Sequence, residues 1–228
     1  MSQEQIDTIV KVVAKACYDQ RERLAKMAAE ETGFGKWQDK VLKNALASKG
    51  ILEEIKDMRT VGILNEDKEN KVIEVGVPVG VVAGLIPSTN PTSTVMYKAL
   101  IALKGGNSIV FSPHPHAAKC INETVDIIKK AAVSAGCPEG AIGVIQRVSI
   151  EATNELMKQQ RYKLDLGNWW ECNGKSCVFI RNTCHWGSPG NVQPLSKKLQ
   201  ISLKQFVKFS IQKLLIMVLS VLLNNQSL

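Results

Sequence analysis

The stretch Val79-Gly-Val-Val-Ala-Gly-Leu-Ile86, which runs into Pro87-Ser-Thr-Asn-Pro, decides the fold. It is apolar on both faces, does not alternate, and has a proline at either end. This pattern is typical of a central parallel strand that is covered on both sides. Asn90 can cap a helix after this strand, and Pro91 suits the first helical turn, where a missing N–H costs nothing.

The second half of the unit follows at once. Apolar residues recur at helical spacing between Pro91 and Gly105, where the glycine ends the helix. Asn107–Phe111 then reads as a second strand, which predicts a right-handed strand–helix–strand crossover. The turns at the carboxyl ends of these strands, Pro87–Asn90 and Ser112–His116, lie where an α/β sheet places its ligand.

The rest of the chain up to residue 166 extends this pattern. Four further helical stretches are predicted: Ile6–Thr32, Trp37–Met58, Ala117–Ala135 and Ile150–Gln159. Four further strands are predicted: Thr60–Leu64, Lys71–Val75, Ala141–Ile145 and one that begins at Leu164. The predicted fold class is α/β, a partial Rossmann-like parallel sheet with crossover helices, preceded by N-terminal helices. The predicted division is 1–58 for these helices, 59–166 for an incomplete nucleotide-binding domain, and 167–228 for a different tail.

Several side chains allow a structural and a functional interpretation. Glu30 and Glu31 form a carboxylate pair, but no His or Cys accompanies them, so we expect a solvated helix end. Cys17 is expected to be a packed apolar side chain rather than a nucleophile. The chain has no G-x-G-x-x-G motif, and Gly76, Gly80 and Gly84, all inside a strand pattern, are predicted to be close-packing sites. In the second helix, the apolar residues predicted to face the core are Val41, Leu42, Leu46, Ile51 and Ile55.

Charge and cysteine usage divide the chain at the same place. The formal charge is +8, but residues 1–166 hold 22 basic and 20 acidic residues, whereas residues 167–228 hold seven basic residues and one acidic residue. A basic tail can bind nucleic acid or an anionic membrane surface. Its apolar run Leu214–Leu223 is too short for a bilayer, which needs about 20 residues. Six cysteines without paired spacing and a polar start predict a reduced, cytoplasmic compartment.

Three blocks resemble a known family: Pro87-Ser-Thr-Asn-Pro-Thr-Ser-Thr, Phe111-Ser-Pro-His-Pro and Glu151-Ala-Thr-Asn-Glu-Leu-Met-Lys. In this order they are similar to the CoA-acylating aldehyde dehydrogenases, above all to the acetylating acetaldehyde dehydrogenase domains of fermentative bacteria. The resemblance covers residues 1–166. It implies an NAD-dependent oxidoreductase that converts an aldehyde and CoA to an acyl-CoA.

The resemblance also implies roles for single residues. The residues expected to line the nicotinamide side of NAD are Ile86, Pro87, Ser88 and Thr89. The residues expected near the adenosine ribose are Ser112, Pro113 and His114. Asn90 would donate a hydrogen bond to the oxyanion of the thiohemiacetal, a role compatible with capping the helix. Because Ser112 stands where many aldehyde dehydrogenases have a lysine, the choice between NAD and NADP stays open.

The resemblance stops after Leu166, where relatives continue with Leu-Ala-Thr-Gly-Gly. Tryptophan has a single codon, TGG, and Asn168-Trp-Trp can be encoded so that reading one base later gives Thr-Gly-Gly-Asn-Ala-Met-Val. Later parts of the tail match the family in the direct frame or two bases later, with the family's nucleophilic cysteine across the codons of Ser220 and Val221. Our hypothesis is that residues 167–228 are frameshifted translation. Codons that cannot encode these peptides would contradict it.

Under this hypothesis the chain lacks its catalytic nucleophile and is predicted to be inactive alone. Zinc binding by Cys172, Cys177, Cys184 and His185 is not expected, because the last two are adjacent. Two alternatives stay open. The chain could be a non-catalytic module that binds a nucleotide or associates with intact relatives, or a protein whose basic tail binds a membrane surface or nucleic acid. Exposed sheet edges favour association, including a homo-oligomer. The prediction is no metal, no membrane and no nucleic acid, with NAD as cofactor.

Overall fold

The centre of the protein is a parallel sheet of five strands. The computed structural model describes residues 1–158, 162–167 and 183–186. In spatial order the strands are β5 (Ile142–Val144), β4 (Ser108–Ser112), β3 (Val81–Leu85), β6 (Tyr162–Gly167) and β7 (Thr183–Trp186). All neighbouring pairs are parallel. The predicted α/β fold class and the predicted central strand are therefore confirmed, whereas β7 was not predicted.

Of the three glycines predicted to be close-packing sites, Gly76 and Gly84 are explained by close packing. A Cβ on Gly84 would lie 2.9 Å from the Phe111 ring, and one on Gly76 would meet the backbone oxygen of Thr60. Both are close-packing sites, as the sequence predicted. Gly80 is different, because it lies before β3 with φ +112°, a conformation that side chains rarely adopt. The prediction that Gly80 lies inside a strand is therefore wrong, and its backbone conformation alone accounts for the glycine.

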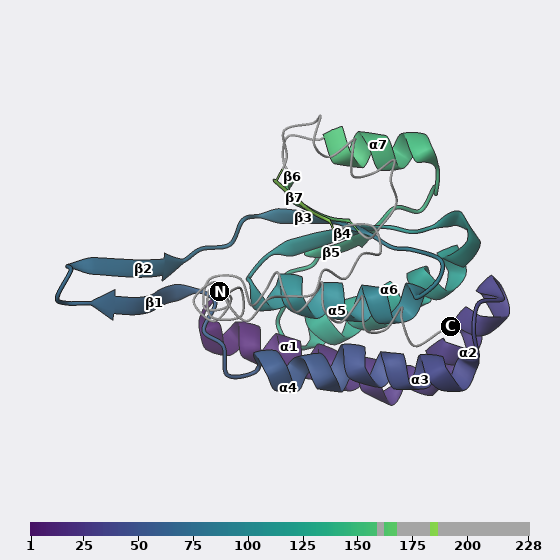
Figure 1. Ribbon diagram of the computed structural model, residues 1–228, viewed down its shortest axis with the longest axis horizontal. Helices are drawn as coiled ribbons and strands as arrows, with labels where there is room; N and C mark the ends of the chain where they lie inside the picture. The colour runs from purple at the N-terminus through teal and green to yellow at the C-terminus, as the bar shows by residue number, and fades with distance from the viewer. Residues whose placement is uncertain (159–161, 168–182, 187–228) are drawn as a thin grey trace, which may run out of the picture.

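Helices cover both faces of the sheet (Figure 1). Helices α5 (Pro91–Lys104) and α6 (Ala118–Ser134) lie on one face, and α7 (Ile150–Lys158) lies on the other. The short 3-10 helix η2 (Pro115–Ala117) leads into α6. Every residue of α5 is buried, because the N-terminal helices cover the side that faces away from the sheet.

The N-terminal helices form this outer layer. They are α1 (Gln3–Asp19), α2 (Arg21–Thr32), α3 (Trp37–Ala45), the π-helical turn η1 (Leu46–Gly50) and α4 (Ile51–Ile55). The sequence predicted one helix over Ile6–Thr32, but the chain breaks at Gln20, which has φ −94° and ψ 5°. The break lets α2 turn away and pack against α3 and α6. One side of α1 is buried, including Ile6, Ile9 and Val13, and Cys17 is buried in it as predicted.

The apolar face predicted for the second helix is confirmed at Ile51 and Ile55 in α4, which are buried, but it is wrong at Leu42 in α3 and Leu46 in η1. Leu42 is 67% exposed and Leu46 is 47% exposed, whereas Lys40 and Asn44 are buried. The buried polar side chains are hydrogen-bonded to other segments, so their burial does not leave a polar group unsatisfied. The π-helical turn η1 then adds a residue to one turn and shifts the face that points inward.

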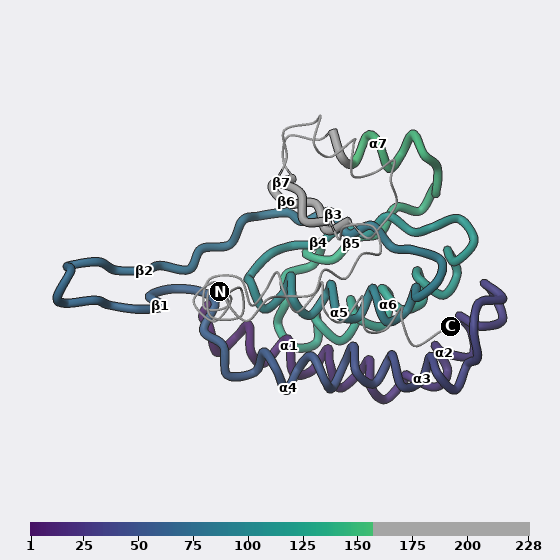
Figure 2. Tube along the Cα trace, viewed as in Figure 1, coloured from purple at the N-terminus to yellow at the C-terminus, as the bar shows by residue number. Residues whose placement is uncertain are grey.

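A two-stranded hairpin projects from the body, as the trace in Figure 2 shows. Its strands β1 (Gly62–Asp67) and β2 (Val72–Gly76) pair antiparallel with an irregularity in register near Asn65. Both strands were predicted, but β1 begins two residues after the predicted start at Thr60 and extends to Asp67, beyond the predicted end at Leu64. Almost all of its side chains are exposed.

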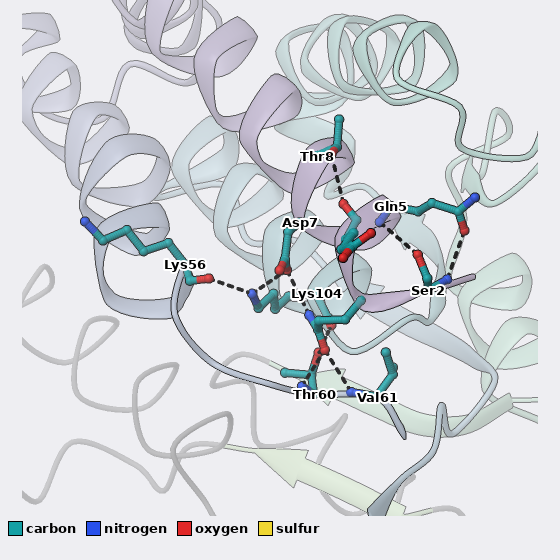
Figure 3. Close-up of polar contacts among 10 residues, drawn as sticks. Ser2, Gln5, Asp7, Thr8, Lys56, Thr60, Val61 and Lys104 are labelled. Carbon is teal, nitrogen blue, oxygen red and sulfur yellow. Dashed lines mark hydrogen bonds and ion pairs between the residues drawn. The ribbon is translucent and has the colours of Figure 1, made fainter. Parts of the chain in front are cut away.

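Polar side chains join the segments at the amino-terminal edge of the sheet (Figure 3). The buried Lys104 ammonium donates to Asp7 Oδ1 at 2.6 Å and to the carbonyl oxygen of Lys56 at 3.1 Å. Gln3 Oε1 accepts from the backbone N–H of Thr60 at 2.8 Å. These contacts fix the base of the hairpin to α1, α4 and the end of α5.

Most expectations about the tail lie outside the described residues. They include the apolar run Leu214–Leu223, the proposed frameshift from residue 168 onward, and two of the cysteines weighed for zinc, Cys172 and Cys177. Among the described residues, no helix is long and apolar enough to cross a membrane.

Candidate functional site

The two turns singled out by the sequence begin side by side. Leu85 and Ser112 are paired at the carboxyl ends of β3 and β4, and the Ile86 N–H donates to the Ser112 carbonyl at 3.0 Å. The strand order reverses at β3, which has β4 on one side and β6 on the other. In open α/β sheets, ligands bind outside the carboxyl ends of the strands at such a reversal.

The turn after β3 combines an apolar base with an exposed hydroxyl residue. Ile86 and Ser88 are buried, at 4% and 7% exposed, and Pro87 is half-buried. Thr89 is exposed, while its carbonyl oxygen accepts a hydrogen bond from Lys40 Nζ at 2.9 Å. A flat, uncharged ring can pack on such a surface.

Asn90 takes the N-cap position of α5 as predicted, but its side chain does not cap the helix. The Asn90 main-chain carbonyl accepts from the Thr94 N–H at 3.2 Å. The side-chain oxygen, Oδ1, instead accepts from the Lys43 ammonium at 3.2 Å. A charged donor outcompetes a backbone N–H for this oxygen, so the predicted side-chain cap is wrong.

The turn after β4 carries a pair of hydroxyl groups. Ser112 Oγ lies 2.8 Å from Thr153 Oγ1 on α7. Thr153 also donates to the Ser149 carbonyl at 3.1 Å. Because a hydroxyl has a single proton, Ser112 is the donor within the pair. Sequence reasoning missed Thr153, although it belongs to one of the three blocks that carried the resemblance.

His114 is half-buried just beyond this pair, and Pro113 is buried. His114 Nδ1 accepts from the His116 backbone N–H at 3.1 Å, and the two imidazole rings meet edge to face at 5.2 Å. Burial, and then the neighbouring His116, hold the pKa of His114 below its ordinary value. Its imidazole is therefore biased toward the neutral form, which keeps one nitrogen as an acceptor.

Three lysines reach oxygen atoms at this edge of the sheet: Lys40, Lys43 and Lys98. Lys98 is fully buried on α5, and its ammonium donates to the Leu85 carbonyl at 2.6 Å. Burial lowers the pKa of Lys98 to about 7. Burial also lowers the pKa of Lys40, with the Lys43 charge as the next cause, and burial lowers the pKa of Lys43. Sequence reasoning missed all three, although lysines among apolar helix residues are a usable signal.

Glu31 contacts the same edge from α2, which corrects the expectation of a solvated helix end. Its carboxylate accepts from the backbone N–H groups of Lys119 at 2.8 Å and Cys120 at 2.7 Å. These groups lie in the first turn of α6, where the helix dipole favours a negative charge. Glu30, by contrast, is exposed as predicted.

Three thiols, Cys17, Cys120 and Cys137, are poorly suited to act as nucleophiles. Cys17, Cys120 and Cys137 are free and buried. Burial raises the pKa of the Cys17 thiol to about 12, and burial is also the largest cause of the raised pKa values of Cys120 and Cys137. The reactive form of cysteine is the thiolate. In the described part of the chain, no cluster of His, Cys, Asp and Glu could hold a metal ion.

A hollow of about 680 Å³ lies at the opposite, amino-terminal edge of the sheet. Its walls include Ile6, Val61, Pro78, Leu103 and Cys137. None of the residues predicted to bind the cofactor lines it. We therefore place the candidate site at the two turns on the carboxyl edge, where the polar groups converge.

Comparison with known proteins indicates the family of this chain. The family model described as aldehyde dehydrogenase family matches residues 1–164. The bifunctional aldehyde-alcohol dehydrogenase of Escherichia coli K12 is 46% identical over 156 residues, which cover 68% of this chain and 18% of that protein. The acetylating succinate-semialdehyde dehydrogenase of Clostridium kluyveri is 44% identical over 197 residues, 86% of this chain and 43% of that protein.

A solved structure shows the same arrangement. The acetylating aldehyde dehydrogenase of Geobacillus thermoglucosidasius superposes with a TM-score of 0.82 at 45% identity, over 91% of this chain and 47% of that one. This chain therefore spans less than half the length of each of these three relatives. The matched sequence and the shared fold lead to one conclusion: the chain belongs to the aldehyde dehydrogenase family.

Proposed function

We propose that this chain is the N-terminal, cofactor-binding part of an NAD-dependent, CoA-acylating aldehyde dehydrogenase. The reaction of such an enzyme converts an aldehyde, CoA and NAD to an acyl-CoA and NADH. The observation that carries the proposal is the pairing of the two turns, joined by the hydrogen bond from Ile86 to Ser112 at the reversal of strand order. Two of the relatives described above are named as acetylating dehydrogenases, which supports the proposal.

The residues at the two turns fit a nicotinamide dinucleotide. Ile86, Pro87, Ser88 and Thr89 would line the nicotinamide, since they offer an apolar surface with a hydroxyl at its rim. Ser112, Pro113 and His114 would lie near the adenosine ribose, whose hydroxyl groups suit neighbouring hydroxyl and imidazole groups. When bound, NAD would supply the hydride acceptor. Asn90 would stabilise the developing oxyanion through its side-chain amide.

Two more distant structural neighbours have been solved with CoA or with a nicotinamide cofactor. A propionaldehyde dehydrogenase of Rhodopseudomonas palustris, 27% identical, has been solved with bound CoA and an acylated cysteine. An engineered glycolyl-CoA reductase, 25% identical, has been solved with bound NADP⁺. We infer that CoA, an aldehyde and a nicotinamide cofactor are the ligands of the intact enzyme to which this chain corresponds.

The buried thiols favour a second candidate, a binding module without turnover. Acyl transfer in this family requires a cysteine thiolate that attacks the aldehyde carbonyl. Cys17, Cys120 and Cys137 are buried with raised pKa values, so none of them can take that role. We propose that the chain binds the cofactor and is inactive alone.

Two measurements on the purified full chain test the proposal. Calorimetric titration with NAD should give saturable binding, and Ser88→Asp, which adds a buried charge beneath the nicotinamide side, should weaken it more than Glu30→Gln on the exposed face of α2. Incubation with acetaldehyde, CoA and NAD should produce no NADH. Absence of NAD binding would contradict the cofactor role, and steady NADH formation would contradict the loss of the nucleophile.

A further inference from the structure

One face of α3 lies against the turn that follows β3 and against the start of α5. The Lys40 ammonium donates to the Thr89 carbonyl at 2.9 Å. The Lys43 ammonium donates to Asn90 Oδ1 at 3.2 Å. Asn44 Oδ1 accepts from the Thr92 hydroxyl at 2.9 Å, and both side chains are buried. Lys40, Lys43 and Asn44 are spaced three and four residues apart, so they share one helix face.

The contact of Lys43 restricts how the Asn90 amide can point. A side-chain amide has an oxygen end that accepts hydrogen bonds and an NH₂ end that donates them. A lysine ammonium has three donors and no acceptor, so it can pair only with the oxygen end. With Lys43 beside Asn90, an amide turned the other way would set NH₂ against a cation. The oxygen end therefore faces α3, and the NH₂ end faces away from it.

We propose that Lys43 is a positioning residue that orients the Asn90 amide for its role as oxyanion donor. The inference rests on the proposed function, because that role of Asn90 is part of it. The cation also polarises the amide, since hydrogen bonds in a chain strengthen one another. The N–H groups of Asn90 are then better donors to a developing negative charge than those of an amide in water.

The neighbouring contacts hold the backbone on either side of Asn90. Lys40 fixes the Thr89 carbonyl, and it is only 5% exposed, so α3 must be docked for this contact to form. Asn44 fixes Thr92 and also donates to the Arg21 carbonyl at 3.0 Å. The cofactor-side turn is thus held by an N-terminal helix as well as by the sheet. To stabilise a transition state, a donor must be held within about 0.5 Å of its productive position.

A purely structural role for Lys43 makes a different prediction. If Lys43 only docks α3, its removal loosens all contacts of that helix face together. If it orients the amide, its removal changes Asn90 while Asn44 keeps its two partners. The charged neighbours of Lys43 include Asp39 on its own helix, which opposes the lowering of its pKa, and Lys40, whose own pKa is lowered by the Lys43 charge.

The experiment is nuclear magnetic resonance of the side-chain NH₂ groups in the ¹⁵N-labelled full chain. Loss of a signal in Asn90→Ala assigns Asn90, and Asn44→Ala assigns Asn44. In Lys43→Met, the Asn90 NH₂ resonance should shift more than any other side-chain amide, and the Asn44 resonance should stay in place. Lys43→Arg, which also has only donors, should restore the position of the Asn90 resonance.

An unmoved Asn90 resonance in Lys43→Met would overturn the proposal, and so would an equal shift of Asn90 and Asn44. A second variant covers the case in which Lys43→Met weakens the fold. Asn90→Asp puts a carboxylate at the same place, so the pKa of Lys43, measured from its ¹⁵Nζ shift, should rise above that of the unmodified chain. An unchanged pKa would also contradict the contact. Because no nucleotide is used, failure here leaves cofactor binding standing, and failure of the NAD titration leaves the amide orientation standing.

Discussion

The two edges of the sheet use charged side chains in opposite ways. At the amino edge, the buried Lys104 ammonium meets the Asp7 carboxylate at 2.6 Å, so a positive and a negative charge offset each other. At the carboxyl edge, Lys40 meets the Thr89 carbonyl and Lys43 meets the Asn90 amide. Glu31 likewise meets backbone N–H groups of α6. Charges at this edge are held against dipoles.

The difference distinguishes the amino edge from the edge that carries the candidate site. A charge beside an opposite charge produces little net electric field in its surroundings. A charge beside a dipole still produces most of its field, because a dipole does not neutralise it. Desolvated charges with perturbed pKa values are typical of sites that bind or transform ligands. The lowered pKa values of Lys40, Lys43 and Lys98 all belong to the carboxyl edge. Four measurements can break or sharpen this comparison.

The largest effect is expected from Lys98, which is fully buried at the carboxyl end of β3. Its folded-state pKa of about 7 lies below the ordinary lysine value of about 10.4. Between these values the unfolded chain binds the proton and the folded chain does not, so the free energy of unfolding rises with pH. The contribution of Lys98 should grow by about 3 kcal/mol between pH 7 and pH 10.

Urea unfolding of the native chain and of Lys98→Met at several pH values isolates this contribution. The comparison with the variant is essential, because the buried Cys17 thiol, with a pKa of about 12, acts in the opposite direction above about pH 8.5. The difference in unfolding free energy between the two chains should change with pH as stated. A constant difference over this range would show that Lys98 is charged when folded, and the contrast between the edges would weaken.

The next largest effect is expected at the amino edge. Asp7→Ala removes the carboxylate from the buried Lys104 ammonium and should lower the free energy of unfolding by about 2 kcal/mol. The value is set below that of a fully buried pair because the Asp7 side chain is 39% exposed. The double variant Asp7→Ala with Lys104→Met should recover part of the loss, since no unpaired charge is then buried. Additive losses in chemical denaturation would refute the pairing.

Sequence reasoning found the carboxyl edge because local patterns specify it. The uninterrupted apolar run Val81–Leu85 can only be buried on both sides, and the proline after Asn90 marks the start of α5. These signals gave the sheet, the crossover and the two turns. They did not give β7, or the exposed side chains of the hairpin, because exposure depends on what the remaining chain covers.

The contacts of α3 could not be read from the same patterns. Apolar periodicity placed Leu42 and Leu46 in the core, yet Lys40 and Asn44 are buried. Polar side chains can be buried when partners from distant segments form hydrogen bonds with them. Thr89 lies 49 residues after Lys40 in the sequence, and Thr92 lies 48 residues after Asn44. The prediction for Glu31 was wrong for the same reason, because the groups that donate hydrogen bonds to its carboxylate belong to α6.

A smaller effect is expected from the acidic pair on α2. Glu31→Ala removes two hydrogen bonds to the first turn of α6 and should cost about 1 kcal/mol in the free energy of unfolding. Glu30→Ala is the matched control, because the neighbouring carboxylate is exposed and should be replaceable within about 0.5 kcal/mol. Thermal unfolding of both variants at pH 7 measures the difference. Equal losses would mean that Glu31 does not cap α6.

The smallest effect is expected from Arg23, which pairs with Glu123 at 2.7 Å between α2 and α6. Both side chains are well exposed, at 52% and 40%, so Arg23→Ala should change the free energy of unfolding by less than about 0.5 kcal/mol. Salt screens exposed pairs, and the difference should vanish in about 1 M salt. Arg23 and Glu123 join the same two helices as the hydrogen bonds of Glu31. Comparing the two variants therefore tests whether the location of a contact or its desolvation determines its contribution to the free energy of unfolding. A loss in Arg23→Ala as large as that in Glu31→Ala would favour location and remove the distinction between charges held against dipoles and charges held against each other.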